Sequence, residues 1–415
     1  MARNTDINRQ LFYRVALMKR FYFMAFFSFV QAQTLQETID YSLAHNYQVQ
    51  ILEQQKSIAS KQEQIVSTWD DPILQAGIND IQGVQPLSRN NEAMQNQFMA
   101  VSQKIPLSNR IELATTIAQQ KQHFIEEKQE AVKVEIAFGI RQAYIEAKNA
   151  QENLKVLDAY INFLKQPLEL ITALSAVESN SIEKYIQTQL LQENFKLQRH
   201  TWLEKIEINK ERIELIGNLK IDNFSDEVPL QHYQQQALEE LLAQIRAKNP
   251  KLKSVEILQE VAQTDVKLAR AKEQADVTIT GGYYQRFDRN DYISLTFSMP
   301  IYTHHKQEYA RVQAMKQANI QDLSYQQTKV ELEQGLKIAL HQLKALYAEY
   351  SILKKNHQKI KKLIANSQAN LRSGGALLHY YELFTQKTNN RLVINQKRLN
   401  IALIENQISQ FLGEI

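Results

Sequence analysis

The chain has 415 residues, of which 44% are hydrophobic and 23% charged, with 10 glycines, 7 prolines and no cysteine. The lack of cysteine excludes a disulfide scaffold, a thiolate metal site, a cysteine nucleophile and an N-terminal lipid-modified cysteine. A mean hydropathy of -0.43 excludes a helical protein that crosses a membrane many times, because such a protein needs repeated apolar runs of about 20 residues. So few glycines and prolines in a chain of this length predict few turns and long elements.

The net charge of +4 originates in the N-terminal segment. Residues 1–32 hold five of the 49 basic residues and one of the 45 acidic residues, which leaves 44 of each in the remainder. A balanced chain gives no support to a nucleic-acid partner, and we expect none.

Residues 1–32 predict a secretory signal peptide. The basic pair Lys19-Arg20 precedes the apolar run 21–30, and a small residue follows at the cleavage position. The run is too short to remain in a bilayer as a spanning helix. Synthesis begins either at the first residue or at Met18. The alternative to a signal peptide is that the segment forms a buried N-terminal helix. We expect the mature chain to begin near Gln33, outside the cytoplasm.

The remainder consists of two repeats with the same plan. The first repeat, residues 33–217, opens with the helical segment Leu35–Asn46, and the second, residues 232–415, opens with the related segment Ala237–Pro250. We expect each opening segment to continue as one amphipathic helix, to about residue 69 or 275. Residues 218–231, between the repeats, predict a linker.

Landmarks recur in the two repeats at a nearly constant offset. Pro106, at the end of a strand-like segment, recurs 194 residues later as Pro300, and Gly217, which closes the first repeat, recurs 196 residues later as Gly413. Landmarks that keep their spacing over so long a stretch indicate an internal repeat rather than chance.

Four segments predict strands, at about 73–82, 93–106, 277–287 and 291–300. Segments of about ten residues with period-two alternation fit transmembrane β-strands, although a soluble antiparallel sheet gives the same pattern. The segment 93–106 is ambiguous, because glutamines share its apolar face. The apolar positions that alternate with small or polar residues are Leu74, Ala76, Ile78, Val277, Ile279, Tyr283, Ile293, Leu295, Phe297 and Met299.

Two strand pairs per chain cannot close a barrel, and lipid does not tolerate an open sheet edge. Membrane strands in this chain would therefore require an oligomer, and three copies would supply twelve strands.

A long helical stretch with heptad spacing follows each strand pair and predicts coiled-coil packing. A helix from residue 108 to residue 174 would be about 100 Å long, which a single globular core cannot use. Gly139, Pro167 and Gly335 interrupt the heptads, and we expect Pro167 to kink its helix rather than end it. The heptad positions are Leu154, Leu157, Ile161, Leu164, Leu168 and Ile171, and then Leu332, Leu336, Ala339, Leu343, Leu346, Tyr350 and Leu353.

This order of elements, given twice, resembles the TolC-like outer-membrane efflux proteins over residues 33–415. The resemblance rests on the opening segments with Asn46 and Asn249-Pro250, on the strand ends at Pro106 and Pro300, and on the Leu/Ile-Gly closures. The segment Asp71–Gly77 resembles the strand entry of the heavy-metal (CzcC/CusC-like) branch. The chain departs from the family in lacking an acylated cysteine, and Tyr47 and Ala275 stand where the family often has proline.

The resemblance implies a mainly α fold with a transmembrane β-barrel: a homotrimer whose twelve-stranded barrel continues as a periplasmic tunnel of coiled helices. It implies a passive exit duct in the outer membrane of a Gram-negative bacterium, joined by a periplasmic adaptor to an inner-membrane pump of RND type. Two alternatives remain open: the duct of a type I protein secretion system, and a secreted or periplasmic coiled-coil structural or interaction protein. No catalytic constellation is present in the sequence, so we expect no enzyme and no cofactor.

Two turn-rich segments, 175–181 and 371–375, predict the tips of the helical hairpins. By resemblance such tips contact the adaptor. The solvated-turn alternative stays open from the residues alone. The tip residues assigned to this contact are Val177, Glu178, Ser179, Arg372, Ser373, Gly374 and Gly375.

Glu382 follows the second tip, near the position where relatives carry acidic gate residues. Three copies on a threefold axis would form a cation-selective ring, whereas the alternative is an ordinary exposed helical glutamate. Thr385 stands where the resemblance leads us to expect a second acid. Pro106 and Pro300 are expected at the junction of barrel and tunnel, because proline suits a bend and the first residues of a helix.

Three other groups of polar residues do not predict a functional site. His304-His305 lack a carboxylate at ligand spacing, so we expect no metal site there. The lysine-rich stretch 354–362 predicts a solvated face or ion pairs between subunits. Asp70-Asp71, beside Pro72, predict turn chemistry between a helix and a strand.

Overall fold

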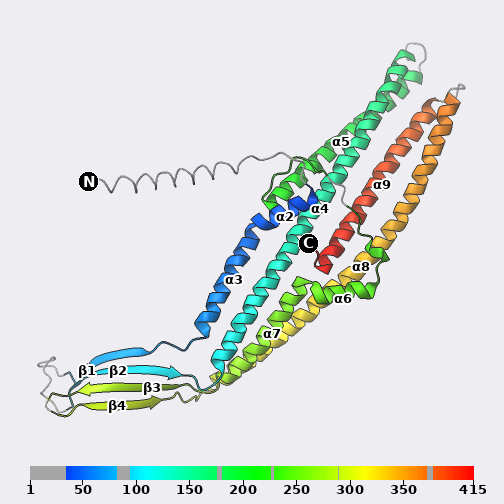
Figure 1. Cartoon of the computed structure of the whole chain (residues 1–415). Coiled ribbons are helices and arrows are strands. Elements are labelled where there is room, and N and C mark those ends of the chain that lie inside the picture. The colour runs from blue at the N-terminus through cyan, green and yellow to red at the C-terminus, as the bar shows by residue number, and fades with distance from the viewer. Residues whose placement is uncertain (1–33, 82–93, 175–179, 226–228, 288, 372–376) are drawn as a thin grey trace, which may run out of the picture.

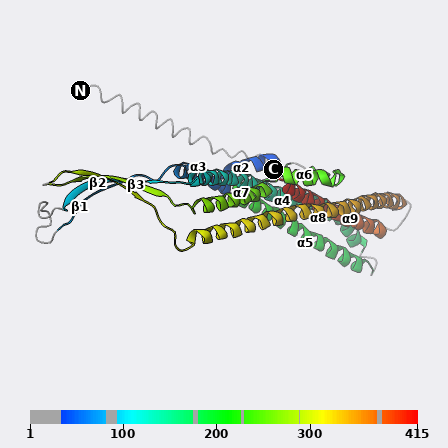
Figure 2. The same ribbon diagram turned by 90° about the horizontal axis from the view of Figure 1, so that it is seen from below.

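The computed structural model describes residues 34–81, 94–174, 180–225, 229–287, 289–371 and 377–415. The molecule is elongated, with a sheet at one end and long helices that run away from it (Figures 1 and 2). The first repeat contains α2 (Leu35–His45), α3 (Tyr47–Val66), β1 (Ile73–Asn79), β2 (Asn96–Ile105), α4 (Arg110–Leu174) and α5 (Asn180–Gly217). The second contains the short 3-10 helix η1 (Tyr233–Gln235), α6 (Leu238–Lys248), α7 (Pro250–Ala271), β3 (Val277–Gln285), β4 (Tyr292–Ser298), α8 (Lys306–Leu371) and α9 (Leu377–Leu412).

The four strands form one antiparallel sheet in the order β1-β2-β3-β4. The central β2–β3 pairing joins the two repeats, and it runs from Gln97 opposite Gln285 to Ile105 opposite Val277. The outer edges of β1 and β4 carry no further strand in the described part of the chain.

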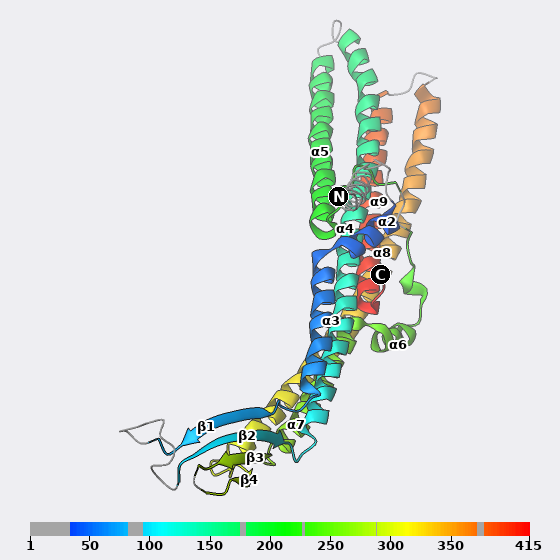
Figure 3. The same ribbon diagram turned by 60° about the vertical axis from the view of Figure 1, so that its left-hand side comes forward.

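The long helices pack as a layer. α4 packs against α5 and α9, and α9 packs against α8, so the order across the layer is α5-α4-α9-α8. Figure 3 shows these helices side by side in the half of the molecule farthest from the sheet. Nearer the sheet, α3 packs on α4, and α7 packs between α4 and α8. α4 continues past Pro167 to Leu174, as expected for a proline that does not end its helix.

The heptads form the core of this layer. Leu157 and Leu164 on α4, and Leu332, Leu336 and Leu343 on α8, are all at most 7% exposed. The segment expected as a linker also contributes: Ile221 and Phe224 are each 4% exposed and pack against α4.

Each opening segment is two helices, not the single helix expected from the sequence. α2 ends and α3 begins at Asn46, and α6 ends and α7 begins at Asn249, where both backbones are extended (ψ 129° and 116°). The side-chain oxygen of each asparagine accepts a hydrogen bond from the first turn of the following helix, from the N–H of Gln48 or Leu252. Pro250 reinforces the break, because the residue before a proline disfavours helical backbone.

The same two asparagines fasten each opening segment to the end of its own repeat. Asn46 Nδ2 donates to the carbonyl oxygen of Ile216 at 2.7 Å, and Asn249 Nδ2 donates to that of Phe411 at 2.8 Å. In each repeat, the asparagine of the opening segment therefore contacts the residue before the closing glycine or the one two residues before it, although they lie far apart in the sequence. We call this contact the joint of the repeat.

The closing glycines leave the space that this joint needs. A Cβ on Gly217 would lie 2.2 Å from the Oγ of Ser42, and one on Gly413 would lie 2.7 Å from the Cδ of Pro250. Gly413 also has a φ of +76°, which L-residues rarely adopt. The glycines that interrupt the heptads, Gly139 and Gly335, face the same joints from α4 and α8, where a Cβ would approach the side chains of Ile216 and Phe411.

Candidate functional site

One face of the sheet is apolar and exposed. The strand register sets Leu74, Val101, Gly281 and Leu295 in one row across the sheet, and Ala76, Met99, Tyr283 and Ile293 in the next. Ile293 is 82% exposed and Leu295 63% exposed. The large exposed side chains of this face are Leu74, Met99, Val101, Tyr283, Ile293, Leu295 and Phe297. A contiguous exposed apolar patch of this kind marks a surface that contacts another protein or a membrane.

The opposite face is polar, small or aromatic. Ser102 and Thr280 hydroxyls are hydrogen-bonded at 2.8 Å across β2 and β3. Phe98, Tyr284 and Tyr292 stack in a row across three strands, with ring centroids 5.4 and 4.8 Å apart. The two faces therefore differ in the way that a sheet between lipid and a water-filled lumen requires.

The register also resolves the ambiguous strand. Gln97 and Gln103 do lie on the apolar face, but they occupy its two ends, while Met99 and Val101 occupy its middle. Gln103 Nε2 donates to the backbone oxygen of Asp70 at 2.9 Å, outside the sheet. The middle of β2 is therefore apolar on this face.

The prolines expected at the junction lie between a strand and a long helix. Pro106 directly follows β2 and precedes α4, which begins at Arg110, whereas Pro300 lies two residues after β4 and precedes α8. Neither proline is inside a helix.

An ion cluster holds this junction together. Asp276, just before β3, is paired with Arg110 at 2.9 Å and with Lys104 at 3.3 Å, and its side chain is 11% exposed. Asp70 is more distant, 3.5 Å from Lys104 and 3.9 Å from Arg110. Asp70 thus belongs to a four-residue network between the repeats, which goes beyond the turn chemistry expected of it.

Glu382 lies on α9 with its side chain exposed, and its carboxylate is 3.7 Å from Nδ1 of His379 one turn earlier. Thr385 has a different environment. Its hydroxyl is hydrogen-bonded to the Tyr160 hydroxyl of α4 and donates to the carbonyl oxygen of Tyr381. The residue at the position where a second acid was expected is thus engaged with α4.

The tip residues assigned to adaptor contact lie outside the described residues, in the segments 175–179 and 372–376. His305 Nδ1 lies 3.2 Å from the carboxylate of Glu308, so the expectation that no carboxylate lies near this histidine pair was wrong. No group of three or more metal-ligating side chains occurs among the residues that the structure describes.

The structure shows polar groups in the core that the sequence patterns did not reveal. Asn149 and Asn153 on α4 and Asn395 on α9 are hydrogen-bonded to one another, at 2.8 to 3.0 Å, within a buried contact between the repeats. Asparagine inside a heptad stretch is the signal that could have found them, because buried asparagine fixes helix register in coiled coils.

A buried glutamate anchors the end of the linker. Glu405 on α9 is 3% exposed and accepts hydrogen bonds from the backbone N–H groups of Gln231 and His232. It also accepts a hydrogen bond from the Tyr347 hydroxyl of α8 at 2.9 Å. Burial, together with this carboxylate, raises the pKa of Tyr347.

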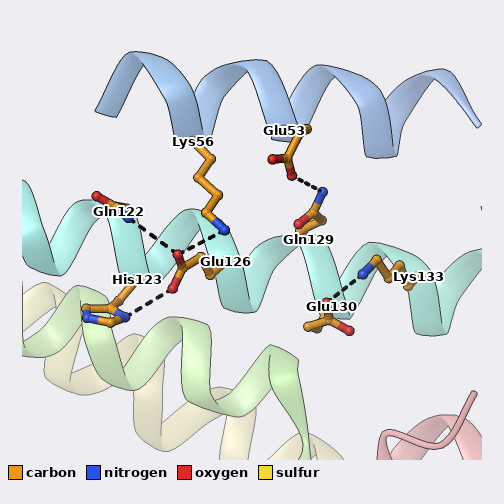
Figure 4. A network of polar contacts seen from close by, with 8 residues as sticks. All are labelled: Glu53, Lys56, Gln122, His123, Glu126, Gln129, Glu130 and Lys133. Atoms are coloured by element: carbon orange, nitrogen blue, oxygen red, sulfur yellow. Dashed lines mark hydrogen bonds and ion pairs between the residues drawn. The ribbon is translucent and has the colours of Figure 1, made fainter. Parts of the chain in front are cut away.

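α3 presents an uncovered apolar stripe on the side away from α4. On the covered side, Lys56 pairs with Glu126 of α4 at 3.2 Å, and Gln129 of α4 donates to Glu53 at 3.2 Å (Figure 4). On the open side, Ile51, Ile58 and Ile65 recur every seven residues and are 55%, 67% and 65% exposed. This heptad stripe has the form of a helix-packing surface that no described part of the chain covers.

None of the helices in the described parts of the chain is both long and apolar enough to cross a membrane.

Comparison with known proteins places this architecture. Residues 241–414, nearly the whole second repeat, match the sequence profile of the family described as outer membrane efflux protein. Comparison with curated protein sequences finds no match.

Solved structures extend the likeness to both repeats. CusC superimposes with a TM-score of 0.75 at 14% identity, over 94% of this chain and 96% of its own. The outer membrane protein VceC of Vibrio cholerae gives 0.74 at 15% identity over 92% and 96%, and the MtrE outer membrane channel of Neisseria gonorrhoeae gives 0.72 at 16% over 92% and 89%. At such identities these likenesses show a shared fold.

The fold of this chain is therefore the fold of outer membrane channel proteins. The second repeat matches the outer membrane efflux protein family, and the whole chain shares the fold of CusC, in agreement with the resemblance stated from the sequence. The family that the second repeat matches, and the structures that share the fold, are proteins of the outer membrane.

Proposed function

We propose that three copies of this chain form the exit duct of a tripartite efflux system. The observation that carries the proposal is the exposed apolar face on a sheet whose two outer edges pair with no strand among the described residues. In lipid, an apolar outer face is favourable but open edges are not, so β4 of one copy would pair with β1 of the next until the ring closes.

The chain supplies an internal template for that closure. β2 and β3 come from different repeats and pair in register inside the chain. β2 is the last strand of one repeat and β3 is the first strand of the next. β4 and the β1 of a following copy have the same relation, so they would pair in the same way. Three copies would give a closed barrel of twelve strands with its apolar face toward lipid.

The helical layer has open edges as well. Leu190 and Leu197 on α5 are 60% and 66% exposed, and Leu323 and Val330 on α8 are 69% and 56% exposed. α5 and α8 are the outermost helices of the layer, so these side chains would be covered when the layer closes into a tunnel. The secreted coiled-coil alternative offers no cover for these helices or for the sheet face.

The remaining assignments rest on the resemblance. The two tips would contact a periplasmic adaptor, which would connect the tunnel to an inner-membrane pump of RND type. Pro106 and Pro300 would mark the change from barrel to tunnel at the inner edge of the membrane. Glu382, exposed on α9 close to the second tip, would form the acidic ring of the gate.

The test is fractionation followed by conductance. The mature protein should be recovered with outer membranes, run as a trimer in detergent and form cation-selective pores in planar bilayers. A monomer that still conducts ions would overturn the trimeric duct. Recovery of the protein in the soluble periplasmic fraction would favour the coiled-coil alternative.

A further inference from the structure

A groove crosses the helical layer in its distal half, on the side of the molecule away from the sheet. Its floor is one face of α9, and α4 and α8 form its walls. The groove has a volume of about 480 Å³, which suits a small organic molecule. It is lined by Val156, Ala159, Tyr160 and Phe163 of α4, by His357 and Lys361 of α8, and by Phe384, Lys387, Thr388 and Arg391 of α9.

One part of the groove is aromatic. Phe163 and Phe384 stack with ring centroids 4.2 Å apart and an interplanar angle of 16°. Tyr160 lies beside Phe163, with centroids 6.0 Å apart. These rings come from two repeats and give the groove an apolar surface against which a further ring can stack.

The other part is cationic. Lys361, Lys387 and Arg391 line it, and none of the three forms an ion pair with any residue that the structure describes. Lys387 Nζ lies 4.8 Å from the centroid of the Phe384 ring, so the charge and the aromatic surface adjoin.

A buried histidine lies beside these positive groups. His357 is 8% exposed, and its Nδ1 is 3.1 Å from the side-chain oxygen of Asn390. Burial lowers the pKa of His357, the Asn390 contact partly offsets this, and the charges of Lys361, Arg391 and Lys387 lower the pKa further. α4 contributes only uncharged side chains to the lining. Among the described residues that line the groove, none from the three helices is acidic.

We propose that this groove binds an organic anion that carries an aromatic ring, with the ring against Phe163 and Phe384 and the acidic group among Lys361, Lys387 and Arg391. An anion would supply the negative charge that these three cations have no partner for. An aromatic ring would stack on the two phenylalanines. The groove is formed within one chain, so the proposal stands apart from the duct and from the trimer.

The test is isothermal titration of the full-length protein in detergent with 2-naphthoate, with detergent alone as the blank. We expect 2-naphthoate to bind at least tenfold more tightly than the neutral 2-naphthamide and than acetate, which lacks the ring. The double variant Lys387→Met/Arg391→Met should weaken 2-naphthoate binding at least tenfold. Lys355→Met, which removes an exposed charge from α8 outside the groove, is the matched control and should leave binding unchanged.

Two further readouts sharpen the test. Phe384→Leu should weaken 2-naphthoate binding while leaving the weak binding of acetate unchanged. Because a bound anion favours the protonated imidazole, binding should tighten as the pH falls from 8 to 6, and His357→Gln should abolish that dependence. Equal affinity for 2-naphthoate and 2-naphthamide, or equal losses in the double variant and in Lys355→Met, would overturn the proposal.

Discussion

α3 and α7 occupy equivalent places in the two repeats, yet they are covered differently. Counted from the equivalent caps Asn46 and Asn249, Ile58 of α3 corresponds to Val261 of α7. Ile58 is 67% exposed, whereas Val261 is 6% exposed in a helix that packs between α4 and α8. The difference fits the proposed trimer: α7 has a cross-repeat neighbour in α4, and in a trimer α3 would pack against the α8 of the next copy.

Substitution by aspartate at Val261 and at Ile58 should have different effects. Val261→Asp buries a charge without a partner and should destabilise the folded chain by about 3–5 kcal/mol. Ile58→Asp should leave the helix content and thermal unfolding of the single chain intact but prevent trimer formation. Circular dichroism measures the first effect, and light scattering in detergent measures the second. A trimer that tolerates Ile58→Asp would show that the stripe on α3 is not an interface.

The next largest loss of stability is expected for a substitution in the joint of the second repeat. Gly413→Ala adds a Cβ 2.7 Å from Pro250 at a φ of +76°, and we expect a loss of about 2–4 kcal/mol from strain and overpacking. Gly281→Ala is the matched control, since its Cβ would meet nothing within 4 Å. Thermal melts followed by circular dichroism should separate the two variants. Equal melting temperatures would contradict the role of the joint.

The ion cluster at the junction of sheet and helices predicts a smaller effect. Asp276→Asn should cost about 1–3 kcal/mol, because Arg110 and Lys104 lose the carboxylate that both of them contact. Asp71→Asn, at an exposed position beside the cluster, should cost little. Unfolding in urea with both variants measures the difference, and similar losses would show that Asp276 does not hold the junction.

The periodic parts of this fold were predictable, because they follow from local patterns. Alternation located the strands and identified the apolar face that the register confirms, and heptads such as Leu332 and Leu336 identified the buried side of α8. The break at Asn249 was also signalled, by Pro250, but the continuous amphipathic pattern suggested one helix and that prediction was wrong.

The joints and the groove were not predictable from periodicity, because each depends on residues that are distant in the sequence. Gly139 and Gly335 interrupt the heptads, and their reason is visible only when Ile216 and Phe411 are seen to approach them. The groove likewise requires three helices from two repeats, and none of its segments is unusual alone. The candidate gate residue could be proposed from its place after the tip, but its partner His379 and the engagement of Thr385 with α4 came from the structure.

Glu382 provides the last and smallest effect, one of selectivity rather than stability. It is the single acidic residue from 376 to 390, its side chain faces water, and in a trimer three copies near the axis would repel one another unless cations screened them. Glu382→Gln should therefore lower the cation selectivity of single channels and weaken their block by divalent cations, while the trimer melts at an unchanged temperature. Glu183→Gln, which removes an exposed charge from the distal hairpin of the first repeat, is the control and should leave both properties unchanged. If the two variants conduct alike, the charge at 382 does not line the pore, and the gate must be sought on another face of α9.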